Sequence, residues 1–282
     1  MKLGRFEIQP LLDGYFRLDG GAMFGVVPKV LWEKTNPADE RNRILLALGA
    51  LLVRVHSKYV LIDTGIGNKG DEKFCDIYGV DRKPSIEESL AKMALSPKDI
   101  QIVINTHFHF DHAGGNTTRL QDGRIVPTFP NAEYYVQRDE WHCAMRPNER
   151  TQRSYLIENY DILAKLDRLN LLDGDAEILP GIRVMKTPGH TEHHQSVIVQ
   201  SEGETVCFLG DLIPTRSHLP LPYIMAYDLF PLTSLETKRR LLDQAHEEGW
   251  WLFFQHDPQA RMGQLDKIDG RYQLREVMRA ER

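Results

Sequence analysis

The sequence predicts an α/β protein that forms one continuous domain. Apolar runs rich in β-branched residues alternate with segments of helical periodicity along the whole of its 282 residues. No internal repeat, low-complexity block or change of composition marks a boundary between two domains. We therefore expect a single domain that spans residues 1–282 and buries a sizeable core.

Strands are expected where an apolar, β-branched run is bounded by turn residues such as Gly, Pro, Asn or Asp. The longest run, Ile44–Val53, is about half of the ~20 residues that a helix needs to span a bilayer, so we interpret it as a buried strand. The expected strands lie at 6–12, 44–55, 58–63, 101–105, 133–136, 182–186, 195–200, 204–209 and 251–255.

Helices are expected in the stretches between these strands. Thr233 and Glu236 have the spacing of a capping box and Gly249 supplies a stop, so the last helix has the clearest signals. Two further segments, 20–32 and 212–232, are apolar but rich in Gly or Pro, which predicts ordered loops. The expected helices lie at 85–95, 138–145, 149–169 and 234–248.

The overall composition excludes several classes of partner. A hydrophobic content of 41% and a formal net charge of -5 are typical of a globular protein with no bulk attraction to nucleic acid or to an anionic membrane. The N-terminal residues lack the apolar core of a signal peptide, and the 3 cysteines suit reduced thiols better than a disulfide framework. We expect a cytoplasmic protein that acts on a small molecule.

The motif THFHFDH contains the densest group of metal-binding side chains in the chain. It follows the apolar run QIVIN, and in an extended chain alternate side chains share one face. On that basis His107, His109 and Asp111 point one way, while Phe108 and Phe110 point into the core. A chance cluster of this density is improbable, so the motif predicts a metal site.

The last residue of the motif, His112, is expected to begin a helix whose positive end faces the same site. The Ala-Gly-Gly that follows is expected to let the backbone turn sharply. Two imidazoles and an adjacent carboxylate–imidazole pair are too many groups for one tetrahedral ion that also takes other ligands. The spacing therefore indicates two metal ions.

Three further candidate ligands each follow an apolar strand elsewhere in the chain. His190 ends VMKTPGH, Asp211 ends VCFLGD and His256 ends WWLFFQH. Open α/β layers build their sites just beyond the ends of such strands. We therefore expect these side chains to complete the metal site.

The pattern HxHxDH, followed by a separate His, Asp and His, resembles the metallo-β-lactamase superfamily over essentially the whole chain. The resemblance implies an αβ/βα four-layer sandwich with a dinuclear metal site at one edge. Asp63, in IDTG, resembles the Asp-Thr-Gly turn of that family and is expected to support the metal loops. The implied ligands are His107, His109 and His190 for the first metal, Asp111, His112 and His256 for the second, and Asp211 as the bridge.

The donor set and the family together imply hydrolysis. Five histidines and two carboxylates without a thiolate suit Zn²⁺ best, with Mn²⁺, Fe²⁺ or Co²⁺ as alternatives. Two such ions lower the pKa of a bound water toward ~7 and hold the resulting hydroxide between them for attack on a carbonyl or phosphoryl centre. Asp111 is the expected catalytic group that orients the hydroxide and carries its proton to the leaving group.

Departures from the family pattern narrow the range of possible substrate classes. Class B1 β-lactamases have a cysteine where this chain has Asp211, which argues against that class. Glyoxalase II binds glutathione with a C-terminal helical region, and too few residues follow His256 to form one, so a thioesterase is disfavoured. The chain most resembles acyl-homoserine lactone lactonases and methyl parathion hydrolase-type enzymes. We expect a small ester or lactone substrate, with a phosphotriester or aryl ester as the alternative. A non-catalytic metal-binding scaffold and an oxidoreductase with another metal are disfavoured but kept as alternatives.

The expected substrate pocket lies in the two apolar loop segments. Many lactonases have a tyrosine three residues after the bridging aspartate, but this chain has Pro214, so Tyr223 or Tyr227 is expected to polarise the substrate carbonyl instead. The roles of His193 and His218 stay open. The same segments have a second interpretation, as a cover of the core or a homodimer interface. The expected pocket residues are Met23, Phe24, Trp141, Leu219, Tyr223 and Ile224.

Overall fold

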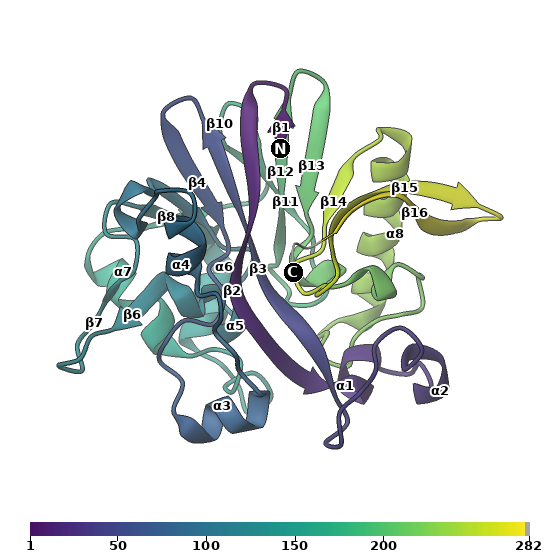
Figure 1. Ribbon diagram of the computed structural model, residues 1–282, viewed down its shortest axis with the longest axis horizontal. Helices are drawn as coiled ribbons and strands as arrows, with labels where there is room; N and C mark the ends of the chain where they lie inside the picture. The colour runs from purple at the N-terminus through teal and green to yellow at the C-terminus, as the bar shows by residue number, and fades with distance from the viewer. Residues whose placement is uncertain (280–282) are drawn as a thin grey trace. The chain divides into compact units, whose positions relative to one another are not determined.

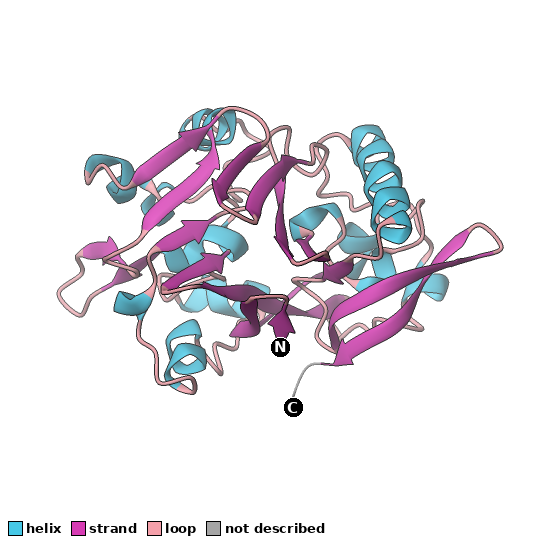
Figure 2. Ribbon diagram, turned by 90° about the horizontal axis from the view of Figure 1, so that it is seen from above, coloured by secondary structure: helices cyan, strands magenta, loops and turns pink. Residues whose placement is uncertain are grey.

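The computed structural model describes residues 1–279, and their contacts divide them into two compact units. The first unit consists of Met1–Gly14 and Leu48–Ala176, and the second of Tyr15–Ala47 and Glu177 onward. Each unit contains one 7-stranded mixed sheet with helices (Figures 1 and 2). The α/β class predicted from the sequence is therefore confirmed.

The sheet of the first unit has an antiparallel half and a parallel half. Its first four strands include the hairpin of β3 and β4, which turns at His56, and its last four strands run parallel. A separate small sheet pairs β6 (Thr117–Arg119) with β7 (Ile125–Pro127). In order across the main sheet the strands are β1 (Lys2–Leu3), β2 (Phe6–Asp19), β3 (Arg43–Val55), β4 (Lys58–Ile62), β5 (Ile102–Ile104), β8 (Glu133–Gln137) and β9 (Leu169–Leu172).

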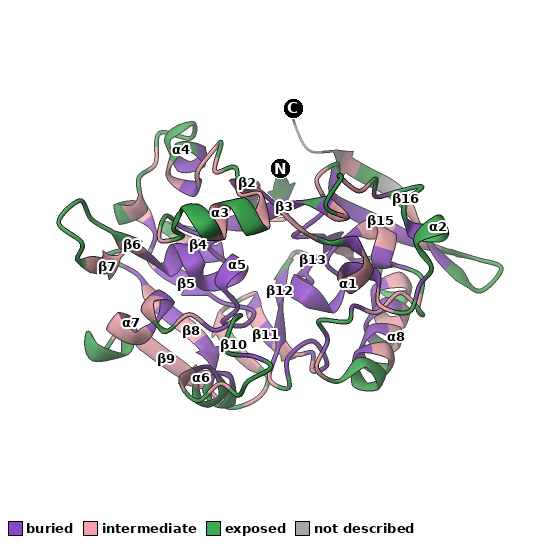
Figure 3. Ribbon diagram, turned by 90° about the horizontal axis from the view of Figure 1, so that it is seen from below, coloured by how far each residue is buried: buried purple, intermediate pink, exposed green. Residues whose placement is uncertain are grey.

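Helices α4, α6 and α7 contribute buried side chains to the core on this sheet, whereas α3 has no buried residue (Figure 3). Ile86 and Leu90 of α4 pack into one cluster with Leu61 and Val103 of the central strands. The capping box of Ser85 and Glu88 starts α4. The helices are α3 (Glu72–Tyr78), α4 (Ile86–Ala91), α5 (Phe110–Ala113), α6 (Arg138–Met145) and α7 (Asp161–Lys165), with 3-10 turns at Pro97–Asp99, Gly114–Asn116 and Ile157–Asn159.

The sheet of the second unit is covered on one face by the long helix α8. Leu241, Leu242 and Ala245 of this helix pack against Cys207 and Leu252 of the sheet. The strands, in order, are β10 (Ala176–Leu179), β11 (Ile182–Lys186), β12 (Gln195–Ser201), β13 (Glu204–Phe208), β14 (Trp251–Phe253), β15 (Ala260–Ile268) and β16 (Arg271–Arg279). The helices are α1 (Gly20–Phe24), α2 (Lys29–Trp32) and α8 (Pro231–Glu247), with 3-10 turns at Gly210–Leu212 and Arg216–His218.

The helix expected at 149–169 is wrong. Within that range only α7 is α-helical, preceded by the 3-10 turn at Ile157–Asn159, and Asp167, in the left-handed backbone region with φ 56°, follows the end of α7. The residues after it form β9 and pair in parallel with β8, from Tyr134↔Leu169 onward. Pairing with a strand distant in the sequence has overridden the local helical pattern.

Two smaller expectations are also corrected. Helix α8 begins at Pro231 without a side-chain cap, so Thr233 and Glu236 form no capping box. The expected stop of this helix is confirmed, because Gly249 has a φ of 68°. The segment 20–32, expected as loop, contains the short helices α1 and α2. Within the described chain, every helix is too short or too polar to cross a bilayer.

The parallel strands explain where functional side chains gather in each unit. In the first unit β4 and β5 run parallel, so Asp63 and the THFHFDH motif follow strands that end at the same edge. In the second unit β13 and β14 run parallel, so Asp211 and His256 likewise share an edge. Each unit therefore presents its own set of candidate metal ligands.

Candidate functional site

The histidine-rich motif of the first unit forms a compact cluster at the end of β5. The ring of His107 lies 4.4 Å from that of His109 and 4.0 Å from that of His112, between centroids. Helix α5 begins at Phe110, two residues before the expected start, so Asp111 lies on the first turn of a helix and not in extended chain. The carboxylate of Asp111 still reaches this cluster, with Oδ2 3.7 Å from Nε2 of His112.

The two phenylalanines of the motif have different surroundings. Phe108 is fully buried in the main core of the first unit, as expected. Phe110 instead packs in a separate aromatic group with Phe74 and Tyr78 of α3, at centroid distances of 5.3 Å and 4.9 Å. The pKa of Tyr78 is raised by its burial and by the nearby charge of Asp111. Phe110 therefore joins α3 to the metal loop.

The glycines after the motif are needed for close packing. The chain makes a 3-10 turn at Gly114–Asn116, as expected, but Gly114 has helical backbone angles, φ -59° and ψ -37°, which do not require a glycine. A Cβ on Gly114 would lie 2.1 Å from the carbonyl oxygen of Ile66, and one on Gly115 would lie 2.1 Å from that of Thr64. Because no side chain fits, these glycines let the metal loop pack directly on the backbone of the 63–67 loop.

A hydrogen-bonded chain holds two imidazoles of the motif. Asp63 is fully buried; its Oδ2 lies 2.9 Å from Nδ1 of His112 and accepts the hydroxyl hydrogen of Thr106 at 2.8 Å. Because the hydroxyl hydrogen is used in this way, the same Thr106 oxygen accepts from Nδ1 of His107 at 3.0 Å. Both rings then carry their hydrogen on Nδ1 and have a lone pair on Nε2, which is the form that binds a metal. Asp63 thus supports the metal loop.

Glu140 of α6 is a supporting residue that the sequence analysis missed. It is fully buried, and its Oε1 accepts from the backbone N–H of Phe108 at 3.1 Å and from the hydroxyl of Tyr155 at 2.9 Å. The ring of Tyr155 packs against that of His109, 4.9 Å away. Burial and the neighbouring carboxylate raise the pKa of Tyr155, so its hydroxyl keeps its hydrogen. A glutamate on an otherwise polar helix carries no sequence signal of this role.

In the second unit, Asp211 lies between two histidines. Nε2 of His190 is 3.2 Å from Oδ2 of Asp211, and Nε2 of His256 is 3.1 Å from Oδ1 of the same carboxylate. All three side chains are buried. Each carboxylate oxygen therefore faces a different imidazole.

The three residues of this second set are held by groups far away in the sequence. Nδ1 of His190 lies 3.0 Å from a carboxylate oxygen of Asp228, and Nδ1 of His256 donates to the carbonyl oxygen of Ala47 at 2.7 Å. The backbone N–H of Asp211 donates to Nε2 of the buried His194 at 3.1 Å. None of these supports was expected from the sequence. A lone acid in the apolar 212–232 segment was the available signal for Asp228.

The chemistry of these contacts fits a divalent cation. In His190 and His256 the Nδ1 hydrogen points at an oxygen, so a neutral ring presents its Nε2 lone pair to Asp211. Two lone-pair atoms about 3 Å apart repel each other unless a proton or a metal ion lies between them. Imidazole nitrogens and carboxylate oxygens are ligands of Zn²⁺ and of its first-row neighbours. The residues of both sets therefore suit metal binding.

Most of the expected pocket residues belong to the second unit, where Met23, Phe24 and Leu219 are buried and Tyr223 and Ile224 are partly exposed. The ring of Phe24 is stacked between those of Trp32 and His218, at 5.3 Å and 4.5 Å, and the ring of Tyr223 meets its edge at 6.1 Å. Trp141 belongs to the first unit, where it packs on Phe108 and Tyr160.

His218, whose role the sequence left open, is a structural residue. Its Nδ1 accepts from the hydroxyl of Thr215 at 2.8 Å and its Nε2 donates to the carbonyl oxygen of Met23 at 2.8 Å. Burial lowers the pKa of His218 to about 3, so the ring is neutral at physiological pH. His218 therefore ties the 212–232 segment to α1 of the same unit.

The chain is similar to several known proteins. The family profile described as the metallo-beta-lactamase superfamily matches residues 50–256. The N-acyl homoserine lactonase of Bacillus thuringiensis is 28% identical over 226 residues, which cover 75% of this chain and 82% of that protein. The crystal structure of a probable metal-dependent hydrolase from Staphylococcus aureus has 37% identity and a TM-score of 0.90, covering 99% of this chain and 100% of that one.

A third comparison concerns the fold alone. AidC, a dizinc quorum-quenching lactonase, is only 22% identical but has a TM-score of 0.81 and covers 100% of this chain and 96% of its own. Together with the family match, these neighbours confirm the predicted metallo-β-lactamase fold.

Proposed function

This chain belongs to the metallo-β-lactamase superfamily, and we propose that it is a dinuclear metal-dependent hydrolase of small esters or lactones. The match spans 50–256, so it includes all seven candidate ligands of both units. It also supports the expectation that both units make up one hydrolase domain. The coarser conclusion, a metallo-hydrolase related to lactonases, follows from the family and from the 28% identical relatives.

We propose that the two sets of ligands together hold two ions. As the resemblance to the family implies, His107, His109 and His190 are proposed for one ion, and Asp111, His112 and His256 for the other. Asp211 is proposed as the bridge. Zn²⁺ is proposed as the metal, because the set combines five imidazoles with two carboxylates and has no thiolate.

The observation that carries the proposal is the position of Asp211. A carboxylate that gives one oxygen to each of two imidazoles is suited to sharing its two oxygens between two cations. A single structural ion would need only one of these contacts. The different supports of His190 and His256 also keep both Nε2 lone pairs directed at this carboxylate.

Two side chains are proposed to act on the substrate. When bound, a pair of divalent ions supplies a hydroxide near neutral pH by lowering the pKa of a coordinated water. Asp111, at the start of α5 and 3.7 Å from Nε2 of His112, is proposed to accept the proton of the attacking water and to pass it to the leaving oxygen. Tyr223 is proposed to donate a hydrogen bond from its hydroxyl to the carbonyl oxygen of the substrate, because Pro214 occupies the position of the usual lactonase tyrosine.

An acyl lactone is the proposed substrate class. The relatives named N-acyl homoserine lactonase support it, and so do the apolar side chains of the 20–32 and 212–232 segments. An aliphatic chain bound on such side chains gains up to ~0.8 kcal/mol for each buried methylene. We further propose a cytoplasmic location, which the free thiols of all three cysteines support, and a homodimer formed through the same segments.

The test is a hydrolysis panel on the metal-loaded enzyme with acyl lactones of increasing chain length, aryl esters, thioesters and phosphotriesters. We expect kcat/KM to rise with acyl length and Tyr223→Phe to slow lactone turnover more than phosphotriester turnover. Tyr227→Phe, in the same segment, tests the other tyrosine that the sequence offers for this role. A flat chain-length series with a silent Tyr223→Phe would exclude the lactonase and leave an esterase or organophosphate hydrolase.

A further inference from the structure

Asp13, on β2 of the first unit, has a fully buried carboxylate that receives hydrogen bonds from three segments of that unit. Its Oδ2 accepts from the backbone N–H groups of Ile66 and Gly67 at 2.9 Å and 3.0 Å. Its Oδ1 accepts from the guanidinium of Arg82 at 2.8 Å and from the N–H of Ile86 at 3.0 Å. Asp13 therefore joins the 63–67 loop to the segment that leads into α4.

The loop held by Asp13 is the one that supports the metal motif. Asp63 and Thr64, at its start, contact the side chain and the backbone of His112: Asp63 lies against Nδ1, and Thr64 donates twice to the carbonyl oxygen, at 2.8 Å and 3.0 Å. At its end, Gly67 packs so closely on Gly114 that a Cβ would lie 2.3 Å from the Gly114 carbonyl oxygen. A displacement of this loop would therefore move His112.

The conformation of the loop is costly and needs an external anchor. Asp63, Gly65 and Gly67 all have left-handed backbone angles, with φ values of 54°, 74° and 69°. For a non-glycine residue such as Asp63 this region is unfavourable, and it persists only where the surroundings enforce it. Of the two N–H groups bound by Asp13, one belongs to Gly67 and the other to Ile66, between Gly65 and Gly67. Without Asp13 both would be buried donors without an acceptor.

Arg82 keeps the carboxylate of Asp13 in the form that this role requires. Among the described residues, every group that hydrogen-bonds to Asp13 is an N–H donor, so a protonated carboxyl would have no acceptor for its hydrogen. Burial raises the pKa of Asp13, and the charge of Arg82 acts against that rise. A buried carboxylate needs such a partner to remain ionised.

We infer that Asp13 and Arg82 are positioning residues for the metal ligand His112, acting through the 63–67 loop. This inference rests on the proposed function, since it assumes that His112 binds a metal. Arg82 binds Asp13, Asp13 binds the 63–67 loop, and this loop in turn contacts the motif. The two residues set the affinity of the second metal by fixing the backbone that carries Asp63 and Thr64, as outer partners of metal ligands do in general.

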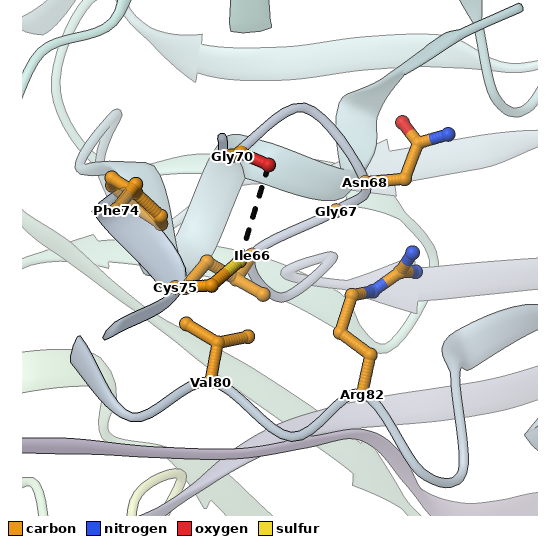
Figure 4. A pocket seen from close by; sticks show the side chains of 8 residues that line it. All are labelled: Ile66, Gly67, Asn68, Gly70, Phe74, Cys75, Val80 and Arg82. Atoms are coloured by element: carbon orange, nitrogen blue, oxygen red, sulfur yellow. Dashed lines mark hydrogen bonds between the residues drawn. The ribbon is translucent and has the colours of Figure 1, made fainter. Parts of the chain in front are cut away.

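The surroundings of Arg82 allow a direct test. Its side chain lines a cavity of about 300 Å³ together with Gly67 and Asn68, and its guanidinium end is directed toward the loop that carries them (Figure 4). The side chain is 22% exposed, so the space left by truncation to alanine is open to a small cation from solvent. Free guanidinium has the shape and charge of the group removed.

The experiment measures Zn²⁺ affinity by competition with a chromophoric chelator, for the full chain and for Arg82→Ala. We expect Arg82→Ala to bind its second Zn²⁺ about 10-fold more weakly, and low, non-denaturing guanidinium to restore most of that affinity. The Zn²⁺ affinity of Arg82→Lys should lie between those of the wild type and of Arg82→Ala. The kcat of Arg82→Ala should recover at saturating Zn²⁺. Arg124→Ala, an exposed arginine paired with Asp122, is the control that guanidinium should not affect.

The outcomes separate this inference from the proposed function. Wild-type chain that binds no Zn²⁺ overturns both. A folded Arg82→Ala with wild-type affinity for two Zn²⁺ ions, or guanidinium acting equally on Arg124→Ala, overturns only the positioning role. Asp13→Asn is a second variant. Each carboxylate oxygen of Asp13 accepts from two N–H groups, so the NH₂ group of asparagine would face two N–H donors in place of one of these oxygens. We expect its loss of Zn²⁺ affinity to equal or exceed that of Arg82→Ala and to resist guanidinium.

Discussion

The two units hold their candidate ligands in different ways. In the first unit the ligands are neighbours in the sequence, and their supports, Asp63 and Thr106, follow adjacent parallel strands. In the second unit His190, Asp211 and His256 come from separate loops. There, His256 depends on a carbonyl oxygen of a residue more than 200 positions earlier, Ala47. The first set is a local motif, whereas the second exists only because distant loops converge.

This difference predicts where each set is vulnerable. The first set is held by close backbone contacts, of Gly114 with Ile66 and of Gly115 with Thr64. Even a small side chain at either glycine would clash with the neighbouring backbone. The second set depends on single side-chain contacts, such as that of Asp228 with His190. We expect substitutions in the second set to act on metal binding with less effect on the fold.

The largest expected effect is that of Asp211→Ala. It removes the carboxylate that faces both His190 and His256, and with it the negative charge that keeps two cations close together. We expect the metal content to fall below two ions per chain and kcat/KM to fall by more than ~100-fold. Elemental analysis and ester turnover measure the two quantities. The exposed Asp139→Ala on α6 is the control, and full activity with two ions retained would refute the bridge.

Next in size is the comparison of Asp63→Asn with Asp228→Asn, one supporting carboxylate from each unit. The amide introduced by Asp63→Asn would direct its N–H either at Nδ1 of His112 or at the N–H of Thr106, and both are unfavourable. In Asp228→Asn the amide oxygen can turn toward His190 at less cost. We expect metal affinity to fall by up to ~100-fold for Asp63→Asn and ~10-fold for Asp228→Asn.

Chelator titration measures both affinities, and circular dichroism checks the fold. Asparagine tolerates the left-handed backbone of position 63, so the comparison isolates the carboxylate. Equal losses in the two variants would show that the units support their ligands with the same strength. A larger loss for Asp228→Asn would reverse the proposed order.

The smallest expected effect is a change in the pH dependence of stability on replacing His218. Burial depresses the pKa of this base to about 3, so between pH 6.5 and 3 the unfolded chain binds a proton that the folded chain does not. The neutral His218 therefore contributes to the free energy of unfolding at higher pH. This contribution decreases as the pH falls through this window, by at most about 1.4 kcal/mol per pH unit. His218→Phe keeps the stack on Phe24 but removes this slope.

Urea unfolding of the metal-free proteins at several pH values tests this expectation. We expect the difference in unfolding free energy between wild type and His218→Phe to shrink from pH 6.5 downward. All other residues are the same in both proteins, so their contributions cancel in the difference. Curves that stay parallel would mean that His218 is protonated equally in the folded and unfolded chains. The exposed His142→Asn on α6 serves as the control for loss of a histidine.

Much of the sheet structure could be predicted from the sequence, because strands buried on both faces are continuous apolar runs. The strand expected at 44–55 contains such a run and matches β3 within a residue. The strand expected at 182–186, in which charged residues interrupt the apolar ones, matches β11 at both ends. The hairpin of β15 and β16 was not predicted, since its residues alternate with many charged side chains. The helix expected at 149–169 failed because its last residues pair with β8.

The chemical type of the site follows from the sequence alone. The spacing of THFHFDH and the positions of His190, Asp211 and His256 just after apolar strands were enough to predict metal binding, because ligand type and local strand ends are properties of short segments. What holds those ligands depends on the folded chain. Asp228, His194, Glu140 and the pair of Asp13 and Arg82 act through contacts across loops and sheets, and no short segment records which distant group will face which.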